Sequence, residues 1–177
     1  MITGRRLDEM GSSINRGVEL LQNHYRFQRM HVVAHSMGGL VARDFILKSR
    51  RDGNHYVDRF VTISTPWGGQ AFAESGVKRA PSAIPSWHDM VPGSEFQDHL
   101  FDDRLRGKVP HLLFYGHRGR RSLTLPAEND GTVSVASQTH DRATADAVEV
   151  RGYDEDHVSI LSNKDVIQRT FRHLDGG

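Results

Sequence analysis

The fold is decided by one stretch of the sequence, His31-Val32-Val33-Ala34-His35-Ser36-Met37-Gly38-Gly39-Leu40-Val41-Ala42. Its first residues are mostly apolar, a serine between small residues follows, and a helical pattern begins at once. This order predicts a strand, a sharp turn that exposes a hydroxyl, and a helix. Because such a turn holds the serine at a strained backbone angle, residues two positions away are expected to be small. Gly38 and Ala34 meet that requirement on either side of Ser36.

The pattern around Ser36 resembles the nucleophile elbow, G-x-S-x-G, of the α/β-hydrolase family, and within that family the lipase and esterase branch. Ala34 stands where the first glycine of the pattern is usual. The resemblance runs from about Leu7 to the C-terminus. It implies a parallel sheet with flanking helices and a serine that attacks a carbonyl carbon.

Length, charge and composition limit the number of domains, the kinds of partner and the kinds of chemistry that the chain can have. The chain has 177 residues, enough for one domain over residues 1–177 with a hydrophobic core. A net charge of +1 gives no reason to expect nucleic acid as a partner, and the lack of cysteine excludes disulfides and a cysteine nucleophile. No stretch approaches the roughly 20 apolar residues of a membrane span. Residues 1–6 lack the apolar core of a signal peptide, which slightly favours the cytoplasm but leaves the compartment open.

Apolar periodicity and turn residues predict an alternation of helices and strands. Helices are expected over residues 7–25 and 37–48 and after Ser162, and strands over residues 30–34, 57–64, 109–115 and 147–150. A strand, a helix and a second strand in this order form a right-handed parallel unit. The predicted fold class is therefore α/β, with a parallel sheet of about four strands flanked by helices.

A long segment without a convincing strand, residues 66–108, separates the second and third predicted strands. It holds both tryptophans and four of the six prolines, and Ser94 with Gln97 forms a capping box before a short helix. At the carboxyl edge of a parallel sheet, such an insertion is typical of a helical lid or cap over a pocket for an acyl chain. The alternative is a long surface loop that packs on the domain without covering a pocket.

Three residues follow the chain order that a serine nucleophile, an acid and a base have in this family. Asp130 follows the third predicted strand in the turn Asn129-Asp130-Gly131, and His157 follows the fourth. Because parallel strands end at one edge of the sheet, the side chains of Ser36, Asp130 and His157 are expected to converge there as a catalytic triad.

Other histidines and aspartates compete for these roles. His140 and His173 also follow Asp130, but the first precedes the fourth predicted strand and the second lies in the last helix. Asp154 and Asp156 fit solvated loop charges better than members of the triad, although either could steer His157.

The resemblance implies further roles near Ser36. The N–H of Met37 is expected to donate to the oxyanion. Residues 65–69, Thr-Pro-Trp-Gly-Gly, are similar to the S-x-P-x-G-G stretch that lipase-like relatives carry after this strand, which implies that Trp67 borders the acyl pocket. His35 is expected to line the same substrate pocket as a packing residue. No group of residues has metal-ligand spacing, and the expected chemistry needs no cofactor.

The sequence departs from the family pattern at its beginning. Family members carry further strands before the first helix, and a loop after one of them supplies a second oxyanion donor. Without such strands, the strand over residues 30–34 would lie at an open edge with unpaired backbone groups. We therefore expect a fragment, a late start, or a chain whose edge pairs with a missing N-terminal segment or with a second copy.

The function expected from these residues is hydrolysis of carboxylic esters of the lipid or acyl class through a serine nucleophile. Two alternatives stay open. An acyltransferase would use the same three residues but pass the acyl group to an alcohol or amine instead of water. A catalytically impaired fragment, or a binding module, would follow from an incomplete oxyanion hole.

Overall fold

The computed structural model describes residues 4–70, 85–120, 125–126 and 128–176. Its strands are β1 (Met30–His35), β2 (Val57–Ile63), β3 (His111–Gly116) and β4 (Glu149–Tyr153). Its helices are α1 (Leu7–Tyr25), α2 (Met37–Arg51), α4 (Pro85–Asp89), α5 (Glu95–His99), α6 (Val135–Gln138), α7 (Asp141–Asp146), the 3₁₀ helix η1 (Ser159–Ser162) and α8 (Lys164–Leu174). The four strands are parallel and lie in the order β1-β2-β3-β4. The predicted α/β class and four-stranded parallel sheet are confirmed.

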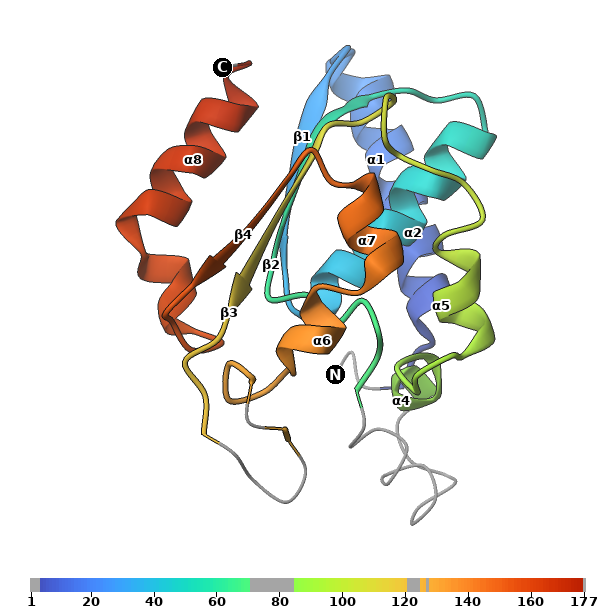
Figure 1. Ribbon diagram of the computed structural model, residues 1–177. Coiled ribbons are helices and arrows are strands. Elements are labelled where there is room, and N and C mark those ends of the chain that lie inside the picture. The colour runs from blue at the N-terminus through green and yellow to red at the C-terminus, as the bar shows by residue number, and fades with distance from the viewer. Residues whose placement is uncertain (1–3, 71–84, 121–124, 127, 177) are drawn as a thin grey trace.

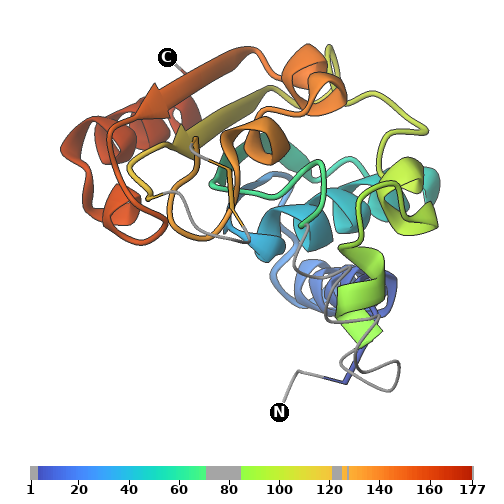
Figure 2. The same cartoon turned by 60° about the horizontal axis from the view of Figure 1, so that its bottom comes forward.

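Helices cover the sheet on both faces. α1, α2 and α7 lie on one face and α8 lies on the other (Figure 1). Figure 2 shows the same layers with the carboxyl ends of the strands turned toward the viewer. Side chains alternate between the faces along each strand, so Phe60 of β2 packs in the cluster that includes Phe45 of α2, and its neighbour Val61 packs with Val166 of α8. Each face of the sheet therefore has its own apolar core.

The first helix has the predicted bounds, but its apolar residues are only partly buried. The buried line of α1 includes Leu7, Gly11 and Val18. α1 and α2 approach closely at Gly11, where a Cβ atom would lie 2.0 Å from Asp44 Oδ2. Three other apolar residues of α1 lie outside this close approach and are exposed: Ile14, Leu21 and Tyr25.

Two predicted boundaries near the C-terminus are wrong. β4 spans Glu149–Tyr153 rather than residues 147–150. Its bounds are set by backbone pairing with β3 and not by the apolar character of its side chains. α8 is capped by Asn163 rather than by Ser162, since Asn163 Oδ1 accepts from two N–H groups of the first turn. Asparagine caps a helix about as well as serine, so the sequence pattern alone did not separate the two.

The described part of the insertion at residues 66–108 contains two short helices, α4 and α5, joined by turns. α5 begins after Ser94, whose Oγ accepts from the N–H of Gln97 at 3.3 Å, as predicted. Gln97 Oε1 accepts from the N–H of Gly93 at 3.3 Å rather than from that of Ser94, so the bond that would complete a capping box is shifted by one residue. Residues 71–84 of the predicted lid lie outside the described residues. The role of the insertion as a lid stays a prediction.

β1 lies at one edge of the sheet, and within the described residues its backbone pairs with β2 alone. The side chain of Val33, in the middle of β1, is 49% exposed. The open edge expected from the sequence is therefore present in the described structure.

β3 carries a fully buried histidine. His111 Nε2 lies 2.8 Å from Thr62 Oγ1, and its ring stacks on Phe60. Burial lowers the pKa of His111 from 6.5 to about 3. Since the unfolded chain binds this proton below its ordinary pKa and the folded chain does not, the folded state loses stability as the pH falls below 6.5.

We expect His111→Gln, which keeps a polar partner for Thr62, to remove this pH dependence. Between about pH 6 and 4, the free energy of unfolding of the parent should fall by about 1 kcal/mol per pH unit more than that of the variant. Urea denaturation at a series of pH values measures the difference, with the exposed His24→Gln as a control. Parallel curves for the parent and His111→Gln would contradict the prediction.

Candidate active site

Ser36 occupies the turn between β1 and α2 with a φ of 56° and a ψ of −137°. A positive φ is uncommon for a residue other than glycine and persists only where the surroundings hold it. Here the N–H of Ser36 donates to the carbonyl O of Ile63 at the end of β2 (2.9 Å), and α2 starts at the next residue. The predicted strand, strained turn and helix are confirmed, and the serine lies at the carboxyl edge of the sheet.

The two glycines after the turn differ in their surroundings. A Cβ atom on Gly39 would lie 2.1 Å from Thr65 Oγ1, so at this position α2 closely approaches the loop after β2. A Cβ atom on Gly38 would meet no described atom of a neighbouring segment within 4 Å. In the described structure the need for a small residue therefore falls on Gly39 rather than on Gly38, whose missing side chain leaves space beside Ser36.

Asp130 is presented by a turn that its neighbours fix. Gly131 has a φ of 94°, which glycine adopts without strain, and its N–H donates to Asn129 Oδ1 at 2.7 Å. Asp130 Oδ1 accepts from the N–H groups of Thr132 (3.0 Å) and Val133 (2.7 Å). These bonds hold one carboxylate oxygen and leave Oδ2 for a different donor.

Two residues that the sequence analysis did not single out brace this loop. Gln138 is buried, and its side chain bonds both backbone groups of Gly116, at the end of β3, and the carbonyl O of Val133, each at 3.1 Å. A Cβ atom on Gly116 would lie 2.6 Å from the carbonyl O of Glu155 and 3.1 Å from the Cβ of Asp130. In the sequence, a glycine at the end of a predicted strand is only a weak signal of a close approach such as that at Gly116. The sequence around Gln138 gives no signal that its side chain is buried.

His157 completes the site from the loop after β4. Its Nδ1 lies 2.7 Å from Asp130 Oδ2, and its Nε2 lies 2.9 Å from Ser36 Oγ. An ionised carboxylate only accepts hydrogen bonds, so Nδ1 carries the proton and Nε2 accepts from the Ser36 hydroxyl. The structure thus brings Ser36, Asp130 and His157 into one hydrogen-bonded series.

Burial alone would raise the pKa of the Asp130 carboxyl group. The hydrogen bonds from His157 and from the N–H groups of Val133 and Thr132 outweigh burial, so the pKa of Asp130 lies below its ordinary value. The carboxyl group is therefore ionised at neutral pH and can stabilise a positive charge on His157.

The competing residues have contacts of their own. His140 caps α7 by accepting from the N–H of Arg142, and His173 of α8 donates to the carbonyl O of Pro110 at 3.1 Å. Asp156 Oδ1 accepts from N–H groups at the start of η1. These contacts give the three residues structural roles.

The two residues expected to line the substrate pocket lie differently from each other. Trp67 is 1% exposed and packs against Phe101 and His111 in the core, and its place at an acyl pocket stays a prediction. His35 is partly buried, and its ring lies beside that of His157, with the ring centroids 4.7 Å apart. His35 therefore contacts His157 directly.

A largely apolar groove begins at Met37. Its volume is about 620 Å³, and it is lined by Arg5, Met10, Ser13, Ile14, Met37, Gly38 and Val41. α1 supplies one wall and the first turns of α2 supply the other. Met37 is the first residue of α2, so its N–H has no acceptor within the helix and lies at the positive end of the helix dipole.

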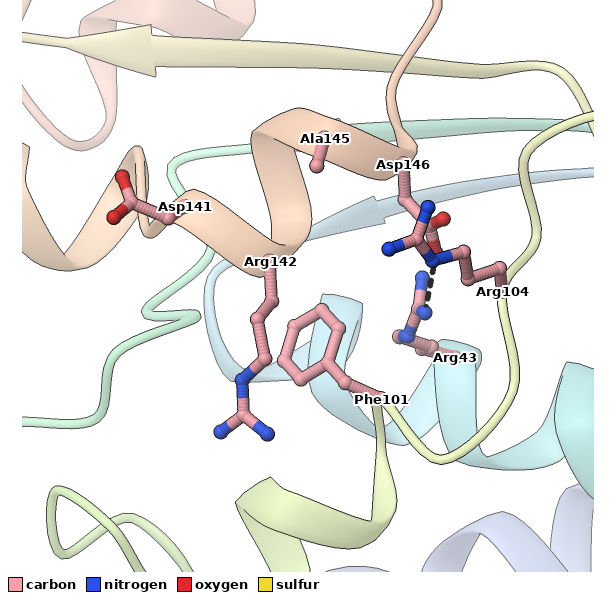
Figure 3. A pocket seen from close by; sticks show the side chains of 7 residues that line it. All are labelled: Arg43, Phe101, Arg104, Asp141, Arg142, Ala145 and Asp146. Atoms are coloured by element: carbon pink, nitrogen blue, oxygen red, sulfur yellow. Dashed lines mark hydrogen bonds and ion pairs between the residues drawn. The ribbon is translucent and has the colours of Figure 1, made fainter.

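A second cavity, of about 300 Å³, lies between α2, α7 and the loop after α5 (Figure 3). Arg43 is fully buried in its wall, where the guanidinium pairs with Asp146 and donates to the carbonyl O of Leu100, both at 2.5 Å. The Cζ of Arg43 lies 4.5 Å from the centroid of the Phe101 ring, and Asp146 also accepts from the N–H of Leu105 at 3.0 Å. These contacts join three segments, and we interpret the Arg43–Asp146 pair as structural.

Within residues 4–70, 85–120 and 128–176, no group of three or more His, Asp or Glu side chains is placed to hold a metal ion. None of the helices in these ranges combines the length and the apolar character needed to cross a membrane.

Residues 8–77 match the model of the family described as lecithin:cholesterol acyltransferase. This stretch holds Ser36 together with most of α1 and all of β1, α2 and β2. No curated protein matches the chain at a significant level.

Solved structures resemble most of the chain. The mature form of the Bacillus licheniformis lipase BlEst2 has a TM-score of 0.70 and 18% identity, over 97% of this chain and 75% of that one. The lin2722 gene product of Listeria innocua has a TM-score of 0.69 and 17% identity, over 98% and 68% of the two chains. The phospholipase PlaB from Legionella pneumophila has a TM-score of 0.62 and 18% identity, and the match covers 76% of this chain and 33% of the PlaB chain. The chain has the α/β-hydrolase fold.

The α/β-hydrolase fold that the Ser36 turn predicts is confirmed. At identities of 17–18% the likeness establishes the fold alone. The activity is therefore argued from the residues of the site.

Proposed function

We propose that the chain is a serine hydrolase that cleaves carboxylic esters of the lipid or acyl class. The observation that carries this proposal is the hydrogen-bonded series Ser36–His157–Asp130 at the strained turn. A nucleophilic serine needs a base within hydrogen-bond reach and a third group that orients the base, and these side chains provide both. The lipase and the phospholipase that share the fold support the substrate class.

In this mechanism, His157 Nε2 takes the proton of Ser36 Oγ while that oxygen attacks the ester carbonyl carbon. Asp130 holds the imidazole in the required tautomer and stabilises its charged form. Collapse of the tetrahedral intermediate expels the alcohol, which receives its proton from His157. Water activated by His157 then attacks the acyl group and releases the acid from Ser36. No cofactor takes part.

The N–H of Met37 is the proposed donor to the oxyanion. It follows the nucleophile directly, lies at the start of α2, and has no acceptor within that helix. Because a Cβ atom at Gly38 would meet no described atom of a neighbouring segment within 4 Å, a substrate carbonyl is proposed to approach this end of the helix.

The acyl chain of the substrate is proposed to lie in the groove between α1 and α2. Met10, Ile14 and Val41 give the groove an apolar lining, and its beginning at Met37 lets a chain attached to the ester carbonyl enter it directly. Burial of each methylene group contributes about 0.8 kcal/mol, so this groove favours long chains over short ones.

We expect Ile14→Trp to fill the groove and to act selectively on long-chain esters. Excluding three or four methylene groups should lower kcat/KM for p-nitrophenyl decanoate by about 50- to 200-fold, while hydrolysis of the acetate ester changes less than about twofold. Leu20→Trp, on the exposed side of the same helix, is the matched control. An equal loss for both esters would exclude this groove as the acyl site.

A fluorophosphonate probe tests the proposed function. The folded parent should be labelled and Ser36→Ala should not, and mass spectrometry should place the label on the peptide that contains Ser36. Hydrolysis of p-nitrophenyl esters of increasing chain length then separates a lipase-like preference from an esterase-like one. A folded chain that is not labelled would contradict the proposal and favour a catalytically impaired fragment or a binding module.

An acyltransferase is the second candidate, and the match of residues 8–77 to the lecithin:cholesterol acyltransferase family favours it. In that reaction an alcohol or amine, rather than water, would attack the acyl group on Ser36. Product analysis with added acceptors separates the two, because a transferase forms the new ester or amide in preference to the free acid.

We further propose that the open edge of β1 pairs with a strand from a second copy or from a segment outside this sequence. Edge strands with unpaired N–H and C=O groups are templates for such pairing, and Val33 is an exposed apolar residue on this edge. Light scattering with and without Val33→Lys tests association of copies. A monomer at high concentration would exclude the second copy as the partner.

A further inference from the structure

His35 is the last residue of β1 and stands directly before Ser36. Its Nε2 lies 2.8 Å from the backbone carbonyl O of His157. A carbonyl oxygen only accepts hydrogen bonds, so His35 Nε2 carries a proton and donates it to this contact. The strand that ends at the serine thereby bonds the backbone of the residue that would act as its base.

This bond spans a gap that the sheet does not close. β1 and β4 are separated by β2 and β3, so no ladder of backbone hydrogen bonds joins the turn at Ser36 to the loop at His157. Among the described residues, two hydrogen bonds connect residues 30–36 with residues 154–158. One is the bond between Ser36 Oγ and His157 Nε2, and the other is the bond from His35.

The bond from His35 completes a three-point attachment of His157. The N–H of His157 donates to the carbonyl O of Asp130 at 2.8 Å, and its Nδ1 donates to Asp130 Oδ2. Both of those bonds fix His157 to Asp130, and neither fixes its distance from Ser36. The next residue, Val158, is 66% exposed. The carbonyl group of His157 is therefore the point at which the backbone of the base is held toward the serine.

We infer that His35 is a positioning residue that sets the distance between His157 and Ser36 through its bond to the His157 carbonyl group. The inference rests on the proposed hydrolase function. A shift of about 1 Å in a reacting group is enough to lower a rate by about 100-fold, so a single bond at this point has a measurable effect.

The charge state of His35 is consistent with this role. Burial lowers the pKa of His35 more than the bond to the His157 carbonyl raises it. The charged or titratable groups that face the ring are His157 and Asp130, the first of which opposes a positive charge on His35 while the second favours it. A neutral His35 donates the same bond without opposing the positive charge that His157 acquires during the reaction. A neutral amide should therefore replace it.

The test compares His35→Met, which fills a similar volume without a donor, with His35→Gln, whose Nε2 can reach the same carbonyl group. His35→Met should lower kcat by about 10- to 100-fold with KM changed less than about twofold, and His35→Gln should restore kcat to within about threefold of the parent. If His35 had only a packing role, the methionine variant would retain kcat or the glutamine variant would fail to restore it. Either result would overturn the inference.

A second readout does not depend on activity. In crystal structures of the variants, His157 Nε2 should lie beyond hydrogen-bond distance of Ser36 Oγ in His35→Met and keep the contact of 2.9 Å in His35→Gln, while the bond from His157 Nδ1 to Asp130 remains in both. An unchanged distance between His157 Nε2 and Ser36 Oγ in His35→Met would overturn the inference. If the parent itself showed no hydrolysis that depends on Ser36, the proposed function would fail, and this distance would still decide the role of His35.

Discussion

Replacing Ser36 with alanine is expected to lower kcat for ester hydrolysis by about 10⁶-fold. The substitution removes the hydroxyl group that donates to His157 Nε2 at 2.9 Å. Neither His157 nor Asp130 can replace it as the nucleophile that forms the acyl intermediate. Because the three residues act as one unit, the double variant Ser36→Ala/His157→Ala should be no slower than Ser36→Ala alone. Steady-state hydrolysis of a short p-nitrophenyl ester, with purified proteins checked for folding by circular dichroism, measures both effects.

A graded series separates this mechanism from a general loss of structure. Asp130→Asn should cost about 10⁴-fold in kcat, less than loss of the serine, because asparagine favours the wrong tautomer of His157 but leaves nucleophile and base in place. Ser12→Ala, which removes a hydroxyl that bonds within α1, should leave kcat unchanged. Activity of Ser36→Ala within about tenfold of the parent would exclude Ser36 as the nucleophile.

The placement of the three residues could be predicted because each lies in the turn or loop that follows a strand. Ser36 and His157 come soon after β1 and β4, Asp130 lies further along the loop after β3, and parallel pairing brings the ends of these strands to one edge. Side-chain contacts between distant segments carry no such local signal. His35 and His157 are 122 residues apart, and no periodicity shows which histidine bonds which carbonyl group.

The errors in the fold have a related cause. An apolar pattern shows which side of a helix can be buried, but burial itself requires a neighbour. α1 has the predicted bounds, yet Ile14, Leu21 and Tyr25 are exposed because no described neighbour covers them. β4 is shifted from its apolar residues toward Tyr153 because its hydrogen-bonding partners on β3 end at Gly116.

The largest expected effect on stability is that of Asp146→Asn, which should lower the free energy of unfolding by about 3–5 kcal/mol. Arg43 is fully buried, and Asp146 supplies the charge that balances it. Asparagine retains an acceptor for the N–H of Leu105, so the loss isolates the charge of the carboxylate. Urea denaturation measures the change, and Asp98→Asn, which breaks the exposed pair with Arg142, should cost less than about 1 kcal/mol.

The double variant Arg43→Met/Asp146→Asn decides whether the loss comes from an uncompensated charge. Methionine fills most of the volume of the arginine stem and needs no partner, so this variant should recover most of the stability that Asp146→Asn loses. The Cζ of Arg43 also lies over the ring of Phe101, and loss of that contact limits the recovery. A double variant as unstable as Asp146→Asn would contradict the explanation by an uncompensated charge. The contacts that Arg43 itself makes with the carbonyl O of Leu100 and with the ring of Phe101 would then account for the stability.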